Sequence, residues 1–214
     1  MAKRIGVIAG SPVDTQMGVD VLAGRGAQAF AYPAAYAARE QTEFQMQSEQ
    51  VRTEKIRTLL KKGIDDGMDD FMIYCNSLSS TVNMPALSKE LGIKIVTPLM
   101  AYARYANEYD RLSVIAGNNQ GLAGIERAIM GANIKCTVIG ASLLPMVVEV
   151  EAKTAPETIV EMFALPSLVD FFEHAGAQAM ILGCTHFPYI REVLNNTINL
   201  PILDPADSMC EMLL

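Results

Sequence analysis

RIGVIAG, at residues 4–10, and RLSVIAG, at residues 111–117, are two versions of one sequence, and this pair decides the fold. Each is a short run of apolar, often β-branched residues that ends in glycine, which is typical of a buried strand leaving a sheet. The two segments lie 107 residues apart in a chain of 214 residues. A chain that repeats its opening strand halfway along its length shows the signature of an internal duplication.

Two further pairs of segments repeat in the same order and at nearly the same spacing. FMIYCN at residues 71–76 corresponds to MILGCT at residues 180–185, and IVTP at residues 95–98 corresponds to ILDP at residues 202–205. Three matches in one order favour a duplicated unit over the alternative that α/β proteins reuse similar strands.

The rest of the sequence alternates short apolar runs with longer amphipathic stretches. Residues 43–62 are predicted to form a helix that ends at Gly63, and residues 120–130 a helix that ends at Gly131. The apolar stripe of the first consists of Phe44, Val51, Ile56, Leu59 and Leu60. Buried strands are predicted at residues 5–8, 71–74, 93–96, 112–116, 136–139 and 180–182.

Alternating strands and helices predict the α/β class. We expect two similar lobes, each a parallel sheet with helices on both faces. The repeat further implies that the lobes are related by pseudo-twofold symmetry, with the active site in the cleft between them. Ligands of such sheets bind beyond the carboxyl ends of the strands.

The composition excludes several classes of function. A formal net charge of −7 argues against a nucleic-acid partner, since such proteins need a basic face. The histidines and carboxylates show no spacing typical of a metal site, and the glycines form no GxGxxG nucleotide motif. No apolar stretch reaches the roughly 18 residues of a membrane span, and the first one is too short for a signal peptide. We therefore expect a cytoplasmic protein with reduced cysteines.

Two of the four cysteines occupy matching positions in the repeat. Cys75 and Cys184 each follow a predicted strand and precede a predicted helix start. The expected symmetry places them on opposite walls of the cleft. Inverting a stereocentre through a carbanion needs a base on one face of the carbon and an acid on the other. A thiolate and a thiol meet this need, because a helix N-terminus lowers the usual thiol pKa of about 8.5.

Polar residues beside the cysteines are candidates for substrate binding. Asn76, Ser77 and Thr185 directly follow the two thiols, and Ser11 lies in the loop after the first strand. These side chains, with backbone N–H groups at the helix starts, are expected to hold a carboxylate and the charge that develops on it.

Two titratable residues are candidates for assisting the thiols. His186 lies two residues after Cys184, where an imidazole can orient or protonate the sulfur. Asp14 follows Ser11 in a loop rich in turn and cap residues, so it is either a helix cap or a carboxylate that assists Cys75. Two other cysteines, at positions 136 and 210, have no such match and are interpreted as structural.

At these residues the chain resembles the aspartate/glutamate racemase superfamily. The two signatures of that family are Cys-Asn-(Thr/Ser) after one strand and Gly-Cys-Thr after a later one. They stand here as Cys75–Ser77 and Gly183–Thr185. The second extends to GCTHFP at residues 183–188, which is similar to glutamate racemases, whereas aspartate racemases more often carry glutamate in place of the histidine.

The resemblance implies an amino-acid racemase that uses no pyridoxal phosphate, no metal and no other cofactor, and that forms a homodimer. It implies that the cysteine pair performs the proton transfers on a small acidic amino acid or dicarboxylate. It also implies a first lobe made of residues 1–97 with 206–214 and a second lobe made of residues 98–205.

Departures from the family leave the substrate open. Glutamate racemases open with Asp-Ser-Gly after the first strand, where this chain has Ala9–Ser11, and its SPVDT loop at residues 11–15 is more similar to aspartate racemases. Glutamate racemases carry Pro-Tyr-Gly, where the nearest string here is Tyr32–Ala34. They also carry threonines where this chain has Gly117–Gln120. His186 favours interconversion of L- and D-glutamate, and aspartate is the alternative.

Two further hypotheses remain. One is a related isomerase or decarboxylase, such as a maleate isomerase or an arylmalonate-type decarboxylase, that uses the same cleft with one or both cysteines in other roles. The other is a degenerate relative that binds a small carboxylate and regulates a partner, and the altered loops motivate it.

Overall fold

The computed structural model describes residues 3–36, 40, 43–44 and 46–214. Its first sheet has four parallel strands in the order β2-β1-β3-β4. The central strands β1 and β3 are almost fully buried, while the edge strand β2 is largely exposed. The elements of this part are β1 (Arg4–Ile8), α1 (Pro12–Ala23), β2 (Gln28–Ala31), α3 (Glu49–Asp65), β3 (Asp70–Ile73), α4 (Asn76–Thr81), α5 (Met84–Leu91) and β4 (Lys94–Val96).

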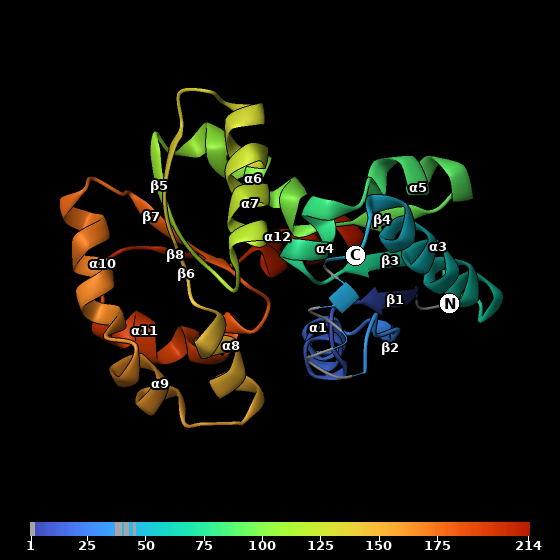
Figure 1. The fold of residues 1–214 in the computed structure, drawn as a ribbon, viewed down its shortest axis with the longest axis horizontal. Coiled ribbons are helices and arrows are strands. Elements are labelled where there is room, and N and C mark those ends of the chain that lie inside the picture. The colour runs from blue at the N-terminus through green and yellow to red at the C-terminus, as the bar shows by residue number, and fades with distance from the viewer. Residues whose placement is uncertain (1–2, 37–39, 41–42, 45) are drawn as a thin grey trace. The chain divides into compact units, whose positions relative to one another are not determined.

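The second sheet repeats this topology, with four parallel strands in the order β6-β5-β7-β8. Figure 1 shows α7 on one side of this sheet and α10 on the other. Two similar parallel sheets with helices around them confirm the predicted α/β class. The elements are β5 (Arg111–Ala116), α7 (Asn119–Ala132), β6 (Thr137–Ser142), α8 (Leu144–Glu151), α9 (Pro156–Met162), α10 (Leu165–His174), β7 (Ala179–Gly183), the 3₁₀ helix η1 (Phe187–Ile190), α11 (Arg191–Thr197) and β8 (Ile202–Leu203).

The chain divides into two compact units, Met1–Met100 with Ala206–Leu214 and Ala101–Pro205. The two divisions fall in α6 (Pro98–Glu108) and at the start of α12 (Pro205–Leu213). Each of these helices begins with a proline that is separated by one residue from the last strand of a sheet. Proline suits the first turn of a helix because its missing N–H would be unpaired there.

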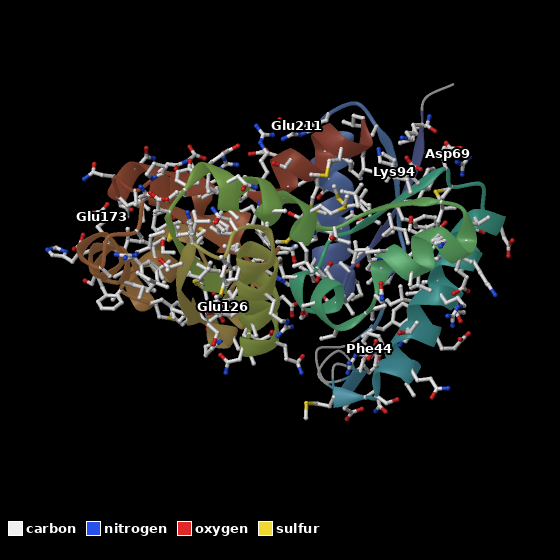
Figure 2. The ribbon with its side chains drawn as sticks, turned by 90° about the horizontal axis from the view of Figure 1, so that it is seen from above. Phe44, Asp69, Lys94, Glu126, Glu173 and Glu211 are labelled. Atoms are coloured by element: carbon white, nitrogen blue, oxygen red, sulfur yellow. The ribbon has the colours of Figure 1, made fainter. Side chains whose placement is uncertain are left out.

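Helix α12 completes the core of the first unit. Met209, Cys210 and Leu213 are buried among the side chains of the first sheet. The ammonium of Lys94, on β4, donates to the carbonyl of Met212, and Figure 2 labels Lys94 and Glu211 on these neighbouring elements. The last helix of the chain therefore belongs to the unit with which the chain begins.

The predicted helix of residues 43–62 differs from the structure at both ends. Helix α3 begins only at Glu49, where the Ser48 side chain accepts a hydrogen bond from the Val51 N–H and caps the first turn. The helix also continues through Gly63. A Cβ at that position would lie 2.5 Å from the ring of Phe71, so the glycine leaves room for that ring. Among the residues of the predicted apolar stripe, Val51 is exposed. Residue 45, within the predicted helix, lies outside the described part of the chain.

The second predicted helix also continues past its expected glycine. Helix α7 includes Gly131 and ends at Ala132, with Asn133 as its cap. Nothing lies within 4 Å of a Cβ at Gly131, so neither a turn nor a close contact requires glycine at this position. Among the helices of the described residues, none has the length and apolar sequence needed to cross a bilayer.

Candidate active site

Cys75 lies where β3 gives way to α4. Its backbone is extended, with φ −163° and ψ 122°, and it occupies the cap position of a helix of six residues. The side chain is buried, and its Sγ lies 3.3 Å from the Oγ of Ser77. The carbonyl of Cys75 accepts hydrogen bonds from the hydroxyl and the N–H of Ser79. The sulfur therefore sits at a fixed point beside a hydroxyl group.

The loop after β1 reaches the same edge of the first sheet. Strands β1 and β3 are paired up to Ile8 and Ile73, and the Tyr74 N–H donates to the carbonyl of Ile8. The loops that follow these two strands carry Ser11 and Cys75. The candidate residues of the first unit therefore come from neighbouring strands.

Asp14 is built into this loop as a helix cap. Its carboxylate accepts the N–H groups of Gly10 and Ser11, at 3.1 Å and 2.6 Å, and the Ser11 hydroxyl at 3.0 Å. The Ser11 side chain in turn caps α1 by accepting from the Asp14 N–H, which completes a capping box. Asp14 is 1% exposed. Of its two predicted roles, the geometry supplies the cap, and assistance to Cys75 stays a prediction.

Cys184 follows β7 in the second unit and leads into a turn. The Phe187 N–H donates to the Cys184 carbonyl, and the 3₁₀ helix η1 starts only three residues after the cysteine. The expectation of a helix start directly after this thiol is therefore wrong. Thr185 and His186 form the turn, and both are buried.

The Cys184 thiol heads a chain of three side chains. Its Sγ lies 3.6 Å from Nδ1 of His186, and Nε2 of His186 lies 3.1 Å from Oε1 of Glu151. A carboxylate only accepts hydrogen bonds, so Nε2 is the nitrogen that carries the proton in the neutral imidazole, and the lone pair of Nδ1 then faces the sulfur. In this tautomer the imidazole can take the thiol proton, and the carboxylate stabilises the positive charge that results.

Glu151 is the functional candidate that the sequence interpretation missed. It ends α8, 35 residues before His186, and no fixed spacing links the two. Its one sequence signal is that it is one of two acids in the stretch LPMVVEVE, whose other residues are all apolar. Glu149, the other acid of that stretch, accepts instead from the Thr154 hydroxyl at the end of the helix.

Gly117 lies against the Cys184 sulfur. It directly follows β5, and a Cβ built there would be 2.8 Å from the Sγ of Cys184 and 3.2 Å from Cγ2 of Val147 on α8. Helix α8 thus carries Val147 on the sulfur side and Glu151 one turn later, on the same helix face.

The other two cysteines lie in the packed interior. Cys136 and Cys210 are fully buried. Burial first, and the Asp110 carboxylate second, raise the pKa of Cys136, which keeps this thiol protonated and unreactive. In the described part of the chain no three His, Cys, Asp or Glu side chains are grouped to hold a metal ion.

Known proteins with similar sequences are racemases of amino acids. The chain is 26% identical to the glutamate racemase of Limosilactobacillus reuteri over 140 residues, which are 63% of this chain and 52% of that protein. It is also 26% identical to the glutamate racemase of Shewanella halifaxensis over 147 residues, 65% of this chain and 54% of that protein. The chain thus spans about half the length of the curated relatives it matches.

Solved structures with the same fold cover nearly the whole chain. The glutamate racemase of Francisella tularensis in complex with D-glutamate has a TM-score of 0.78 at 20% identity, over 99% of this chain and 79% of that one. An aspartate racemase homologue from Pyrococcus horikoshii has a TM-score of 0.75 at 13% identity, over 99% and 97%. At these identities the likeness concerns the fold.

The family comparison extends over most of the molecule. The sequence model of the Asp/Glu/hydantoin racemase family matches residues 20–213, from α1 to α12, and includes both cysteine signatures. The chain therefore belongs to the Asp/Glu/hydantoin racemase family.

Proposed function

We propose that the protein is a cofactor-independent racemase that interconverts L- and D-glutamate by moving the α-proton between Cys75 and Cys184. The observation that carries the proposal is that, in each of two sheets of identical topology, a thiol with a polar partner follows the third strand within two residues. In this mechanism the two thiols address opposite faces of one carbon, and their roles exchange with the direction of the reaction.

The two thiols are proposed to differ in how they are activated. On the Cys184 side, His186 accepts the thiol proton and Glu151 stabilises the imidazolium, which yields a thiolate. On the Cys75 side, the hydroxyl of Ser77 lies 3.3 Å from the sulfur, where it can donate to a thiolate and stabilise it but cannot act as the base that removes the thiol proton.

Substrate binding is assigned to the polar residues that flank the thiols. Asn76 and Thr185 directly follow the two cysteines and are 4% and 7% exposed. Ser11 is held by Asp14 in the neighbouring loop. We assign the substrate carboxylates to these groups and give Asp14 the task of shaping the loop that presents Ser11.

Glutamate is the proposed substrate because His186 follows the GCT signature, as in glutamate racemases, and because the sequence relatives are glutamate racemases. Aspartate is the second candidate, because the SPVDT loop at residues 11–15 is more similar to aspartate racemases. The expected homodimer belongs to this proposal and is measured by analytical ultracentrifugation.

The test follows the α-proton in D₂O. Purified protein is incubated with each enantiomer of glutamate and of aspartate, and both recovered substrate and product are analysed by chiral chromatography with mass spectrometry. A two-thiol mechanism places solvent deuterium in the product while the early recovered substrate keeps its proton. Exchange into the substrate at the same rate would indicate a single base, and no exchange with any of the four amino acids would overturn the proposal.

Cysteine variants complete the test. Cys75→Ser and Cys184→Ser are expected to lower racemisation at least 100-fold each, the usual range for loss of a general acid or base. Cys136→Ala, at a buried thiol without a counterpart in the repeat, serves as the matched control and keeps activity. Full activity in a folded Cys184→Ala protein would favour one-cysteine chemistry, and tight binding without turnover would favour the regulatory hypothesis.

A further inference from the structure

We infer that Gly117 is a positioning residue for the Cys184 thiol, because the absence of a side chain there determines where the sulfur lies. The inference deepens the proposed function and rests on it. It assigns a role to the glycine that ends the second copy of the VIAG repeat, which is adjacent to Cys184 in space although 67 residues separate them in sequence.

The geometry leaves no room for a methyl group at this position. A Cβ on Gly117 would lie 2.8 Å from Sγ and 3.4 Å from Cβ of Cys184. Non-bonded carbon atoms pack favourably at about 3.5–4.0 Å, and sulfur is larger than carbon. Adding the methyl group therefore forces one of its neighbours to move.

The backbones on both sides of the contact are anchored. Strand β5 pairs with β6 and with β7, and its last residue, Ala116, is in register with Gly183, which precedes the cysteine. A hydrogen bond from the Phe187 N–H to the Cys184 carbonyl fixes the turn beyond it. Gly117 and Cys184 are therefore each held next to a paired strand position.

The remaining neighbour, Val147, is anchored as well. It lies on α8 between Met146 and Val150, which are buried. Rotation about one Cα–Cβ bond moves either the sulfur or the Val147 methyl groups, but valine on a helix has one strongly preferred χ1 position, whereas the cysteine side chain has three staggered positions. The sulfur is also the nearer neighbour, at 2.8 Å against 3.2 Å. We therefore expect an added methyl group to turn the sulfur into another rotamer while the fold stays intact.

A rotated sulfur loses its contact with His186 and its position relative to the substrate. The contact of 3.6 Å with Nδ1 of His186 breaks, so the imidazole no longer takes the thiol proton. The sulfur also leaves the position from which it reaches the substrate, and a displacement of 1 Å can cost about 100-fold in rate. Gly117→Ala is thus expected to lower kcat about 100-fold in both directions, with KM changed less than about threefold.

The matched control is another crowded glycine of the same sheet. A Cβ at Gly140, on β6, would lie 2.4 Å from Cδ1 of Leu122, so Gly140→Ala crowds the unit without a contact to the thiol. It is expected to keep kcat within about threefold. Loss of activity to the same extent in both variants would assign the effect to crowding of the fold and would overturn the inference.

A readout without turnover separates this inference from the proposed function. In a Cys75→Ser background, iodoacetamide labels Cys184, and mass spectrometry of its peptide gives the labelling rate from pH 5 to pH 9. Gly117→Ala is expected to change this rate and its pH dependence by removing the sulfur from His186. An altered profile in a protein that racemises no amino acid upholds the positioning role and rejects the function, whereas an unaltered profile rejects the positioning role.

A second variant tests whether crowding at the sulfur, and not a change in the fold, causes the loss of activity. Val147→Ala, added to Gly117→Ala, removes methyl groups from the other side of the contact, so the new Cβ can shift away from the sulfur. Partial recovery of kcat and of the labelling profile is expected. The sulfur is expected to move while the fold stays intact. The inference would be contradicted if the melting temperature of Gly117→Ala fell by more than about 10 °C. It would also be contradicted if the double variant recovered neither kcat nor the labelling profile.

Discussion

The imidazole of His186 is held from both sides, with Cys184 at one ring nitrogen and Glu151 at the other. Glu151→Gln removes the charge from the acceptor while the side chain keeps its size. Hydrogen bonds to charged groups contribute about 1.5–3 kcal/mol, so kcat is expected to fall about 10- to 100-fold in both directions. Steady-state kinetics with each enantiomer measure this loss, with KM nearly unchanged.

Glu149→Gln is the control for that experiment, since Glu149 lies on the same helix and accepts from the Thr154 hydroxyl instead. It is expected to keep kcat within about twofold. Equal losses in the two variants would show that the charge of α8, and not the contact with His186, matters for catalysis.

The candidate site was predictable from sequence only where residues are adjacent in the chain. Ser77 and His186 lie two positions from their thiols, and both contacts are present in the structure. Glu151 contacts His186 and Gly117 contacts Cys184, and both lie at the ends of other elements of the second unit. Their contacts depend on the packing of α8 beside η1 and of β5 beside β7, and a single sequence does not encode that packing in any local spacing.

Tyr32 provides a pH-dependent contribution to stability. Burial first, and the hydrogen bond to the Asp66 carboxylate second, raise the pKa of Tyr32 to about 12. An unfolded tyrosine ionises near pH 10, so between pH 10 and 12 the folded protein keeps a proton that the unfolded chain has lost, and stability falls as the pH rises. Two pKa units set an upper limit of about 3 kcal/mol, and solvent screening at the exposed Asp66 reduces the expected loss to about 1 kcal/mol.

Urea unfolding at pH 9 and at pH 11.5 measures this effect. Tyr32→Phe lacks the ionising group, so its free energy of unfolding is expected to fall less over this interval than that of the parent protein. Tyr36→Phe, at a tyrosine whose side chain is mostly exposed, is the control. Its free energy of unfolding is expected to fall over this pH interval as much as that of the parent protein. A Tyr32→Phe protein whose free energy of unfolding falls as much as that of the parent protein would contradict the prediction.

At the scale of elements, two glycines separate backbone conformation from packing. Gly92 caps α5 in the left-handed conformation, with φ +66° and ψ 30°, and nothing lies within 4 Å of a Cβ there. Gly92→Ala therefore introduces strain without a clash and is expected to destabilise the protein by about 1 kcal/mol. Gly131→Ala, in α7 and equally free of contacts, is expected to stabilise it by about 0.5 kcal/mol.

Thermal and urea unfolding of the two variants measure these differences. The opposite signs are the essential part of the prediction, because both changes add the same methyl group to open space. Destabilisation by both variants to the same extent would show that contacts, and not the backbone angles, dominate at these positions.

The sequence predicted the inner strands well and the edge strands unevenly. The edge strands β4 and β6 coincide with the segments predicted at residues 93–96 and 136–139, although β6 continues to Ser142. Strands β1, β3, β5 and β7 are continuous apolar runs because they lie inside their sheets, and they agree with the predicted segments to within one or two residues. The edge strand β2, of sequence QAFA and largely exposed, and the two-residue strand β8 were not predicted as strands. Neither β2 nor β8 contains a fully buried residue, so their sequences carry little of the apolar pattern that reveals a strand.

Helix ends were predicted less well, because caps and packing decide them. Gly92 ends α5 in the left-handed conformation that favours glycine, and Gly24 ends α1 with a right-handed φ of −61°. Gly63 instead lies inside α3 and makes room for the Phe71 ring. The same residue type thus answers two demands, and only the three-dimensional contacts distinguish them.

At the scale of the whole molecule, the two sheets share one topology but differ in the chemistry at their ends. Both sheets have the same strand order, and each places a cysteine after its third strand. The partner of the thiol is a hydroxyl in the first unit and an imidazole with a carboxylate in the second. A racemase needs two groups on opposite faces of one carbon, but it does not need them to be activated in the same way.

The core of the first unit depends on a helix that follows the last strand of the second sheet. Met209 of α12 is fully buried within that core. Truncation of a buried methionine to alanine costs about 2–5 kcal/mol, because apolar contacts are lost and a cavity remains. Met209→Ala is therefore expected to destabilise the first unit selectively, and hydrogen exchange followed by mass spectrometry compares the amide protection of β1 and β3 with that of β5 and β7. Glu211→Ala, at an exposed position of the same helix, is the control and should change neither sheet. Equal loss of protection in both sheets would mean that the two units unfold as one, whereas unchanged protection in β1 and β3 would mean that α12 adds little to the core it completes.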